Sequence, residues 1–269
     1  MTHYPRHLEP QRNWGACCKM MQSTVRRVAS KLMAAACAVV RDEAAKEAEE
    51  LCASGQYAAA GVPLQRAIYF GHLPSRALKA WLLVNGREGV AKDEERGFEF
   101  AEEGARLGCH HCQGLLAWCY CKGYGCVKDA ARSLELACES SGRGSRYGQH
   151  VLGELYNFGK GGVAQDYDQA VAFYRLAAEQ GLDDAQWWMG IMYFNGDGVR
   201  EDDDEAHRWH QLAGAQGHPE VLFNQAEYHE DGLGDVAEAI RWYRRAQAAG
   251  QRDAAVELRR LRAENPFLF

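Results

Sequence analysis

The sequence lacks the features that mark several common classes of protein. No apolar run reaches the roughly 18 residues that a membrane-spanning helix requires. The motifs G-x-S-x-G and H-E-x-x-H of hydrolases are absent, and the stretch Gly159-Lys160-Gly161-Gly162 lacks the Ser or Thr that ends a phosphate-binding loop. Proline is scarce as well, with 6 among 269 residues, which is ordinary for a helical globular chain. We therefore expect no transmembrane segment, no enzymatic activity, no cofactor and no small-molecule substrate.

Acidic residues are scarce at the N-terminal end and abundant elsewhere. Residues 1–41 carry seven Lys or Arg and one acid, Glu9, so they contribute +6 to a total net charge of −6. The remaining residues therefore carry −12. Because binding to a phosphate backbone needs a basic face, the acidic body argues against nucleic acid as a partner.

The basic N-terminal region, residues 1–41, forms a separate segment. We expect an irregular arm over residues 1–22 and an amphipathic helix over 23–41, with Val25, Val28 and Leu32 on its apolar side. An acid-poor, Arg-bearing amphipathic leader resembles a mitochondrial transit peptide, and the alternative is a basic arm or helix that caps the body. The expected location is cytoplasmic or mitochondrial, and a secretory signal fits less well.

Residues 42–74 resemble a degenerate helical pair. A first helix is expected over about Glu43–Ala53, followed by a break at Ser54-Gly55. A second helix is expected within Tyr57–Phe70, where Pro63 predicts a late start or a kink. This pair would close one end of the regular array that follows.

Residues 75–252 contain an internal repeat with a period of 36 or 37 residues. A valine ends a glycine-rich turn in each unit, at Val90, Val127, Val163, Val199 and Val236. A glycine closes each second helix, at Gly71, Gly108, Gly144, Gly181, Gly217 and Gly250. Two independent markers share one period, which indicates repeated helix-turn-helix units. Residues 253–269 would then be a C-terminal capping helix and tail.

Each unit also carries residues suited to helix pairing. Gly153 and Gly190 allow close approach of a neighbouring helix, and a tyrosine three residues later fills the gap between helices. An acid precedes each second helix and can cap its free backbone N–H groups, at Asp93, Asp129, Asp166 and Asp202. These positions are therefore explained by the fold.

The combined pattern resembles the Sel-1-like repeat, a relative of the tetratricopeptide repeat. The match is LG-x-x-Y-x-x-G-x-G-V, then D-x-x-x-A-x-x-W, then A-A-x-x-G, and it is nearly complete over 151–181 and 188–217. The resemblance implies an all-α, right-handed α/α superhelical solenoid of about five to six helix-turn-helix repeats. It also implies a non-catalytic scaffold or structural subunit that binds protein partners within a larger assembly. A mitochondrial complex subunit or assembly factor is the alternative placement.

In such solenoids the first helices line the concave face, where a partner segment would bind. Several positions of these helices that face away from the Gly/Tyr packing side carry large or apolar residues. The candidate positions are Trp81, Val84, Trp118, Glu154, Asn157, Trp187, Ile191 and Phe194. One interpretation is a partly aromatic groove that binds a peptide or an apolar helix. The alternative is that these side chains pack between repeats or under the N-terminal segment.

The ten cysteines include one dense cluster with histidines. Cys109, His110 and Cys112 are weak candidates for a zinc site, because C-x-x-C is present but no second C-x-x-C follows. Some cysteine-rich members of the resembled family tie helix pairs with disulfides, and Cys112 with Cys138 is a loose counterpart. Reduced, partly buried thiols are the remaining alternative. A metal-binding or thiol-redox protein is thus the competing functional class.

Overall fold

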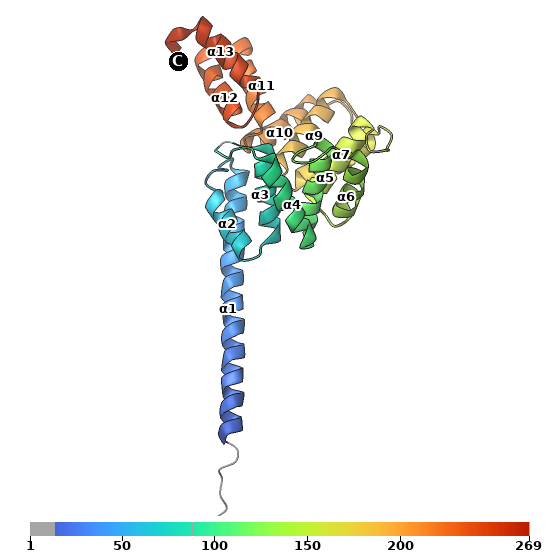
Figure 1. The fold of residues 1–269 in the computed structure, drawn as a ribbon. Coiled ribbons are helices and arrows are strands. Elements are labelled where there is room, and N and C mark those ends of the chain that lie inside the picture. The colour runs from blue at the N-terminus through green and yellow to red at the C-terminus, as the bar shows by residue number, and fades with distance from the viewer. Residues whose placement is uncertain (1–13, 88, 269) are drawn as a thin grey trace, which may run out of the picture.

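The computed structural model describes residues 14–87 and 89–268, with side chains described from residue 26 onward except at 28. Within these residues the fold is all-α, and the one isolated β-bridge joins Arg87 and Val90. Successive helix pairs pack side by side into a solenoid (Figure 1). The repeated pairs are α3 (Leu73–Asn85) with α4 (Glu94–Arg106), α5 (His110–Lys122) with α6 (Ala130–Gly142), α7 (Arg146–Phe158) with α8 (Tyr167–Glu179), α9 (Asp183–Asn195) with α10 (Asp203–Ala215), and α11 (Pro219–Glu227) with α12 (Val236–Ala248).

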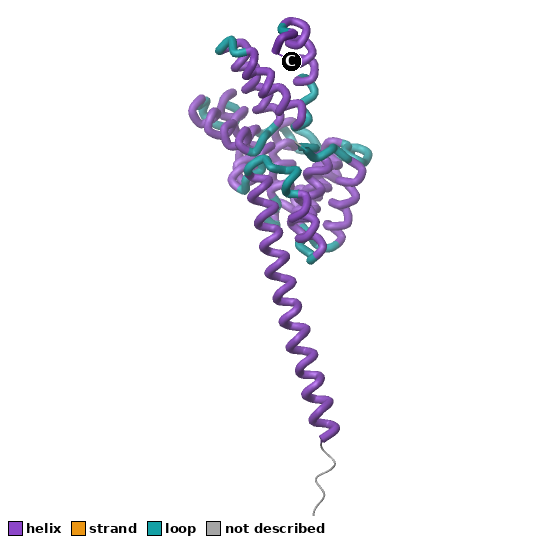
Figure 2. The backbone as a smooth tube through the Cα atoms, turned by 90° about the vertical axis from the view of Figure 1, so that its left-hand side faces the viewer, coloured by secondary structure: helices purple, strands orange, loops and turns teal. Residues whose placement is uncertain are grey.

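The first helix, α1 (Trp14–Ala53), is a single helix of 40 residues that projects away from the solenoid (Figures 1 and 2). The prediction of an irregular segment is wrong for residues 14–22, and the helix does not break near residue 42. Pro5 and Pro10 both precede it, and no proline interrupts the sequence from 14 to 53. Residues 1–13 and the side chains of Val25 and Val28 lie outside the described part. Among the described residues, no helix is both long and apolar enough to cross a membrane.

Only the C-terminal part of α1 packs on the body. Ala44 and Ala45 are buried against Ala67 of α2 (Gly61–Tyr69), whereas Leu32 and Met33 are exposed. The helix ends at Ala53, as the Ser54-Gly55 break predicts. The late start of α2, at Gly61, places Pro63 in the first turn. Backbone N–H groups there have no intrahelical acceptor, so the N–H that proline lacks costs no hydrogen bond.

The caps of the repeat helices follow the sequence pattern. The side chain of Asp166 accepts a hydrogen bond from the backbone N–H of Gln169, and the other predicted acids do the same at the starts of their helices, at Asp93, Asp129 and Asp202. Gly159 ends α7 in the left-handed conformation, with φ 59°. These local signals fix where each helix begins and ends.

Gly153 of α7 and Gly190 of α9 lie against aromatic rings of the following helices. A Cβ at Gly153 would lie 2.5 Å from Cδ1 of Tyr174 on α8. Tyr174 is fully buried and stacks on Trp188 at 5.6 Å, so its ring has no room to move away. The expected close helix approach at Gly153 is therefore confirmed.

Replacing Gly153 by Ala is expected to lower the free energy of unfolding by about 1–3 kcal/mol, because overpacking outweighs the gain in helix propensity. Gly142→Ala is the matched control, since nothing lies within 4 Å of a Cβ at that position. Urea unfolding of both variants checks this. An equal response of the two would show that Tyr174 does not restrict position 153.

The last repeat departs from the others. Its first helix, α11, stops at Glu227 and passes into a π-helical turn, Tyr228–Gly232, before α12. The buried residues of α11, α12 and α13 (Ala254–Glu264) form their own core cluster, separate from the cluster that joins α1 to α10. A short 3-10 turn, Pro266–Leu268, follows α13. In Figure 1 these C-terminal helices stand apart from the rest of the solenoid.

The solenoid curves until its beginning meets its fourth repeat. The hydroxyl of Tyr57 donates to the backbone carbonyl of Gln216 at 2.5 Å, across 159 positions of sequence. Arg87, in the turn after α3, reaches Asp183 and Asp184 at the start of α9. The concave side of the first four repeats is thus closed into a ring by these long-range contacts.

Candidate functional site

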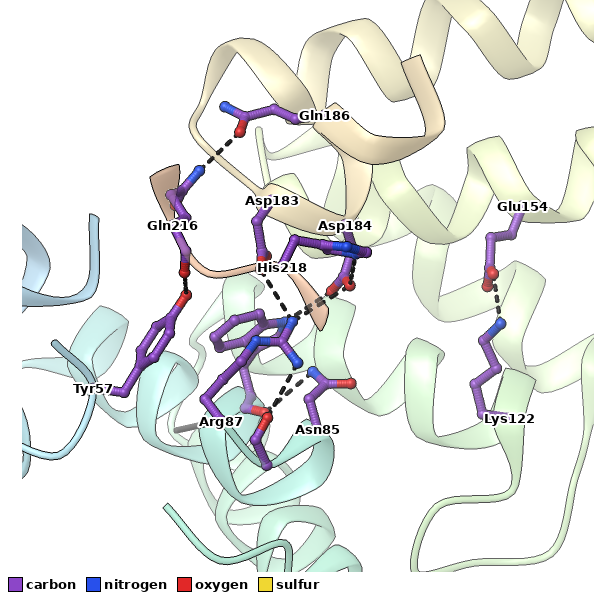
Figure 3. Close-up of polar contacts among 12 residues, drawn as sticks. Tyr57, Asn85, Arg87, Lys122, Glu154, Asp183, Asp184, Gln186, Gln216 and His218 are labelled. Atoms are coloured by element: carbon purple, nitrogen blue, oxygen red, sulfur yellow. Dashed lines mark hydrogen bonds and ion pairs between the residues drawn. The ribbon is translucent and has the colours of Figure 1, made fainter. Parts of the chain in front are cut away.

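The ring closes through a buried group of charged residues. The Arg87 Nη2 atom lies 3.1 Å from Asp183 Oδ2 and 3.4 Å from Asp184 Oδ1, while its guanidinium lies 4.4 Å from the ring centre of Trp81. His218, at the start of α11, places Nε2 3.3 Å from Asp184 Oδ1. Figure 3 shows the two carboxylates, the guanidinium and the imidazole converging from three separate elements. We call Arg87, Asp183, Asp184 and His218 the closure cluster.

Burial and charge act in opposite directions on this cluster. Burial by itself would raise the pKa of Asp184, but its hydrogen bond with His218 and the charge of Arg87 outweigh burial and hold that pKa well below its usual range. Burial also disfavours the Arg87 cation, yet the two aspartates raise the pKa of Arg87 above its ordinary value. The cluster is therefore held by charge pairing that the surrounding protein shields from water.

A pocket of about 270 Å³ opens beside the closure cluster on the concave side. Side chains from five successive units line it, including Lys92, Trp118, His150, Trp187 and Glu220. The His150 ring lies 4.3 Å from that of Trp118, and Trp187 stacks on His218 at 5.4 Å. We call this cavity the concave pocket. It combines aromatic walls with charged groups at its edge, as ligand sites do.

One further ion pair forms a wall of the concave pocket. Lys122 at the end of α5 lies 2.5 Å from the buried carboxylate of Glu154 on α7. Burial by itself would lower the pKa of Lys122, but the charge of Glu154 and the hydrogen bond to it together outweigh burial and raise that pKa. In Figure 3 this pair lies to the right of the closure cluster.

The structure divides the side chains that were candidates for a partner groove. Trp118, Glu154 and Trp187 line the concave pocket. Trp81 is buried beneath Arg87, and Val84 is fully buried against α4, where a Cβ at Gly97 would meet its Cγ2 at 2.5 Å. Val84 fits the packing interpretation, whereas Trp81 is 3% exposed, about as buried as Trp118, and lines a second cavity of about 380 Å³.

The remaining three candidates lie outside the concave pocket. Asn157 is buried, and its backbone carbonyl accepts a hydrogen bond from Gln165. Ile191 is half-buried on α9, whereas Phe194 near the end of the same helix is 61% exposed. Within the described residues, the basic part of α1 does not cover these positions, because it projects away from the body (Figure 1). Phe194 therefore keeps an open surface, but apart from the other aromatic candidates.

The cysteine cluster does not assemble as the competing interpretation requires. Cys109, Cys112 and Cys138 are all free thiols, with Cys112 fully buried and Cys138 exposed on α6, so the Cys112–Cys138 pairing is not formed. The Sγ atom of Cys109 caps α5 by accepting a hydrogen bond from the backbone N–H of Cys112 at 3.4 Å. Within the described residues, no three His, Cys, Asp or Glu side chains converge as a metal site, and this includes His110.

Cys109 nevertheless has an altered acidity. A hydrogen bond with the Cys112 thiol outweighs burial and, together with the backbone N–H groups at the start of α5, lowers the pKa of Cys109 below its ordinary value. Its side chain is almost completely buried, however. The lowered pKa thus accompanies a helix cap that solvent does not reach freely.

The neighbouring His111 predicts a measurable dependence of stability on pH. Burial, with the nearby charges of His110 and Arg146, lowers the pKa of His111 to about 4. An unfolded histidine titrates near pH 6.5, so below that pH the unfolded chain binds more protons and the folded state loses stability. Between pH 7 and pH 4.5 His111 should account for a loss of about 2.5 kcal/mol.

The measurement is urea unfolding at both pH values for the wild type and for His111→Phe, which cannot titrate. We expect the variant to lose about 2.5 kcal/mol less than the wild type over this interval. Equal losses in the two proteins would show that His111 is protonated alike in the folded and unfolded states.

Several residues of the site escape detection in the sequence. Arg87 lies in a turn, and Asp183 and Asp184 resemble ordinary acids at a helix start. Nothing in the local pattern pairs them, because 96 positions separate Arg87 from Asp183. The one available signal is Asp183-Asp184 itself, since the other first helices carry no acid in their first turn until α11.

Stacked helix pairs of one period, curved around a concave pocket, define an α/α solenoid repeat protein. The Sel1 repeat pattern matches five consecutive segments of the chain, at 80–109, 110–145, 146–182, 183–218 and 219–250. These segments cover more than half of the sequence, and the chain belongs to the Sel1 repeat family. Proteins of this family are generally scaffolds for protein–protein interaction.

Two solved structures illustrate the likeness. A Sel1 repeat protein from Oxalobacter formigenes shares 24% sequence identity, with 83% of this chain and 91% of that chain covered and a TM-score of 0.50. A putative Sel1 repeat protein from Klebsiella pneumoniae shares 21% identity, with 67% of this chain and 89% of that one covered and a TM-score of 0.46. Comparison with curated proteins gives no match. At these identities the first structure supports the fold alone.

Proposed function

We propose that the chain is a non-catalytic scaffold that binds a segment of a partner protein at the concave pocket. The observation that carries the proposal is the convergence of aromatic and charged side chains from successive repeats on one cavity, at Trp118, His150, Trp187 and Lys122. A structural role in packing alone would not require a hollow at this point. The proposal places the pocket, not Phe194, at the centre of the partner surface.

Site-specific cross-linking tests this proposal. Tyr124 lines the concave pocket, while Tyr167 begins α8 and lies outside it. The photoreactive residue p-benzoylphenylalanine replaces each tyrosine in turn, and illumination of the full chain in its own cells is followed by peptide mass spectrometry. We expect a defined partner peptide to cross-link from position 124 and not from position 167.

Two results would contradict the scaffold proposal. One is cross-linking of the same partner from both positions with equal yield, which would place the interface elsewhere. The other is an absence of any protein adduct at position 124 in cells where the chain is fully expressed. The basic segment 1–41 as a targeting signal stays a separate prediction, and neither outcome depends on it.

A further inference from the structure

We propose that the second cavity, the one lined by Trp81, binds a free α-amino acid with an apolar side chain. This cavity measures about 380 Å³, and we call it the ring cavity. Residues from both sides of the ring closure line it, from the last turns of α1 on one side and from α9 and α10 on the other. The proposal adds a small-molecule site to the scaffold and does not rest on binding at the concave pocket.

Arg146, at the start of α7, brings a positive charge to the wall of the ring cavity. Its guanidinium donates to the backbone carbonyl of Gln180 at 3.3 Å and to the hydroxyl of Tyr147 at 3.2 Å, and both residues also line the cavity. Among the described residues, no carboxylate lies within 4 Å of this guanidinium. Arg146 is half-buried, so a ligand can reach it. Since a guanidinium has five N–H donors, it keeps donors for a ligand carboxylate.

Glu49, on α1, brings the opposite charge to the same cavity. Glu49 is exposed, and its carboxylate forms no ion pair with any described residue. Tyr147 contributes most to the raised pKa of Arg146, and the more distant charge of Glu49 raises that pKa further against the effect of burial. The ring cavity is therefore lined by two opposite charges that lie too far apart to pair directly.

This combination favours a zwitterion over a ligand with a single charge. A ligand with only a carboxylate would meet Arg146 but would also approach Glu49 and Asp183, which line the same cavity. A ligand with only an ammonium group would approach the Arg146 cation. An α-amino acid carries both groups on one carbon, so each group can meet the opposite charge. Charge-assisted hydrogen bonds would then hold both ends of the ligand.

The size and the remaining wall of the ring cavity select the rest of the ligand. Leu78, Trp81 and Leu182 form apolar parts of the wall, and Leu212 is 44% exposed there. About 380 Å³ is near the lower end of the range for small-molecule sites, which suits one amino acid and not a peptide. A peptide also separates its ammonium and carboxylate groups to opposite ends. We therefore expect a single amino acid with an aliphatic or aromatic side chain.

Isothermal titration calorimetry of the full chain tests the inference. The probes are L-leucine and L-phenylalanine. Isocaproate and hydrocinnamate are their analogues without the ammonium group, and isoamylamine and phenethylamine are their analogues without the carboxylate. We expect saturable binding of at least one of the two amino acids. Each of its two analogues should bind about tenfold more weakly, because each lacks one charge-assisted contact.

Matched variants assign the two charges, described here for L-leucine. Glu49→Gln should weaken L-leucine binding about tenfold and leave isocaproate binding no weaker, because isocaproate has no ammonium group. Glu47→Gln is the control, since Glu47 is exposed on the same helix but does not line the ring cavity. Arg146→Met should weaken L-leucine and isocaproate by about tenfold and leave isoamylamine no weaker. Arg146 also contacts the end of α8 at Gln180, so the exposed Glu49 decides the test if Arg146→Met does not fold.

Three results would overturn the amino-acid inference. They are an absence of saturable binding by both amino acids, binding of the amino acid no tighter than that of its analogue without the ammonium group, and equal affinities in Glu49→Gln and Glu47→Gln. The scaffold proposal is tested separately, by cross-linking from position 124 in the concave pocket. A failed cross-link together with successful amino-acid binding would leave a small-molecule site in a chain without the proposed partner surface.

Discussion

Replacing Arg87 by Met is expected to lower the free energy of unfolding by about 3–5 kcal/mol, because it leaves two buried carboxylates without their cation. Asp183 and Asp184 have side chains that are 2% and 17% exposed, so water cannot replace the guanidinium fully. The substitution also removes the contact that joins the turn after α3 to the start of α9. We therefore expect a larger radius of gyration by small-angle X-ray scattering as well as a lower urea midpoint.

The control for this effect is a second arginine in an ion pair at the surface. Arg132 pairs with Glu135 on α6, with side chains 49% and 66% exposed. Arg132→Met should change stability by at most about 1 kcal/mol, since exposed pairs contribute little. In the double variant Arg87→Met with Asp183→Asn, part of the lost stability should return, because one uncompensated charge is gone. Equal losses of stability in Arg87→Met and Arg132→Met would mean that the closure cluster does not hold the ring closed.

The repeat architecture can be read from the sequence because its signals are local. The valine and glycine markers recur once per unit, and each capping acid lies at the start of its own helix, as Asp166 does before α8. These features act within a few residues, so one sequence suffices to identify them. The break after Ala53 and the late start of α2 at Pro63 follow from the same kind of local chemistry.

The site depends on the total rotation that accumulates from one repeat to the next, and no local sequence signal encodes that total. Ring closure buries Trp81 beneath Arg87, although its position in α3 resembles that of Trp118 in α5. The same closure brings Asp184 to His218 and Arg87 and creates the concave pocket. Helix periodicity therefore identifies candidate residues, but the curvature of the solenoid decides which of them line a cavity.

The second large effect concerns the boundary between the two core clusters. Leu155 on α7 is fully buried in the cluster of α1 to α10, and Leu222 on α11 is 2% exposed in the cluster of α11 to α13. Leu→Ala at either site removes a comparable side chain and should cost about 2–5 kcal/mol locally. In a solenoid the effect spreads only as far as the interfaces between neighbouring repeats transmit it.

We expect the two substitutions to differ in where stability is lost. Leu222→Ala should reduce the hydrogen-exchange protection of α11–α13 by about a hundredfold and leave α7 unchanged, because the cores do not merge at this junction. Leu155→Ala should show the reverse pattern. Hydrogen exchange with mass spectrometry resolves both, and a uniform loss of protection in both variants would mean that the array unfolds as one unit.

The boundary also crosses the concave pocket, which gives the prediction a functional consequence. Trp118 and His150 belong to the larger cluster or its contacts, whereas His218, Pro219 and Glu220 come from the start of the C-terminal unit. A ligand that bridges these walls binds only when both units are folded, so it should stabilise α11–α13 in proportion to its occupancy. In Leu222→Ala, binding of the partner segment at the concave pocket should therefore restore part of the hydrogen-exchange protection of α11.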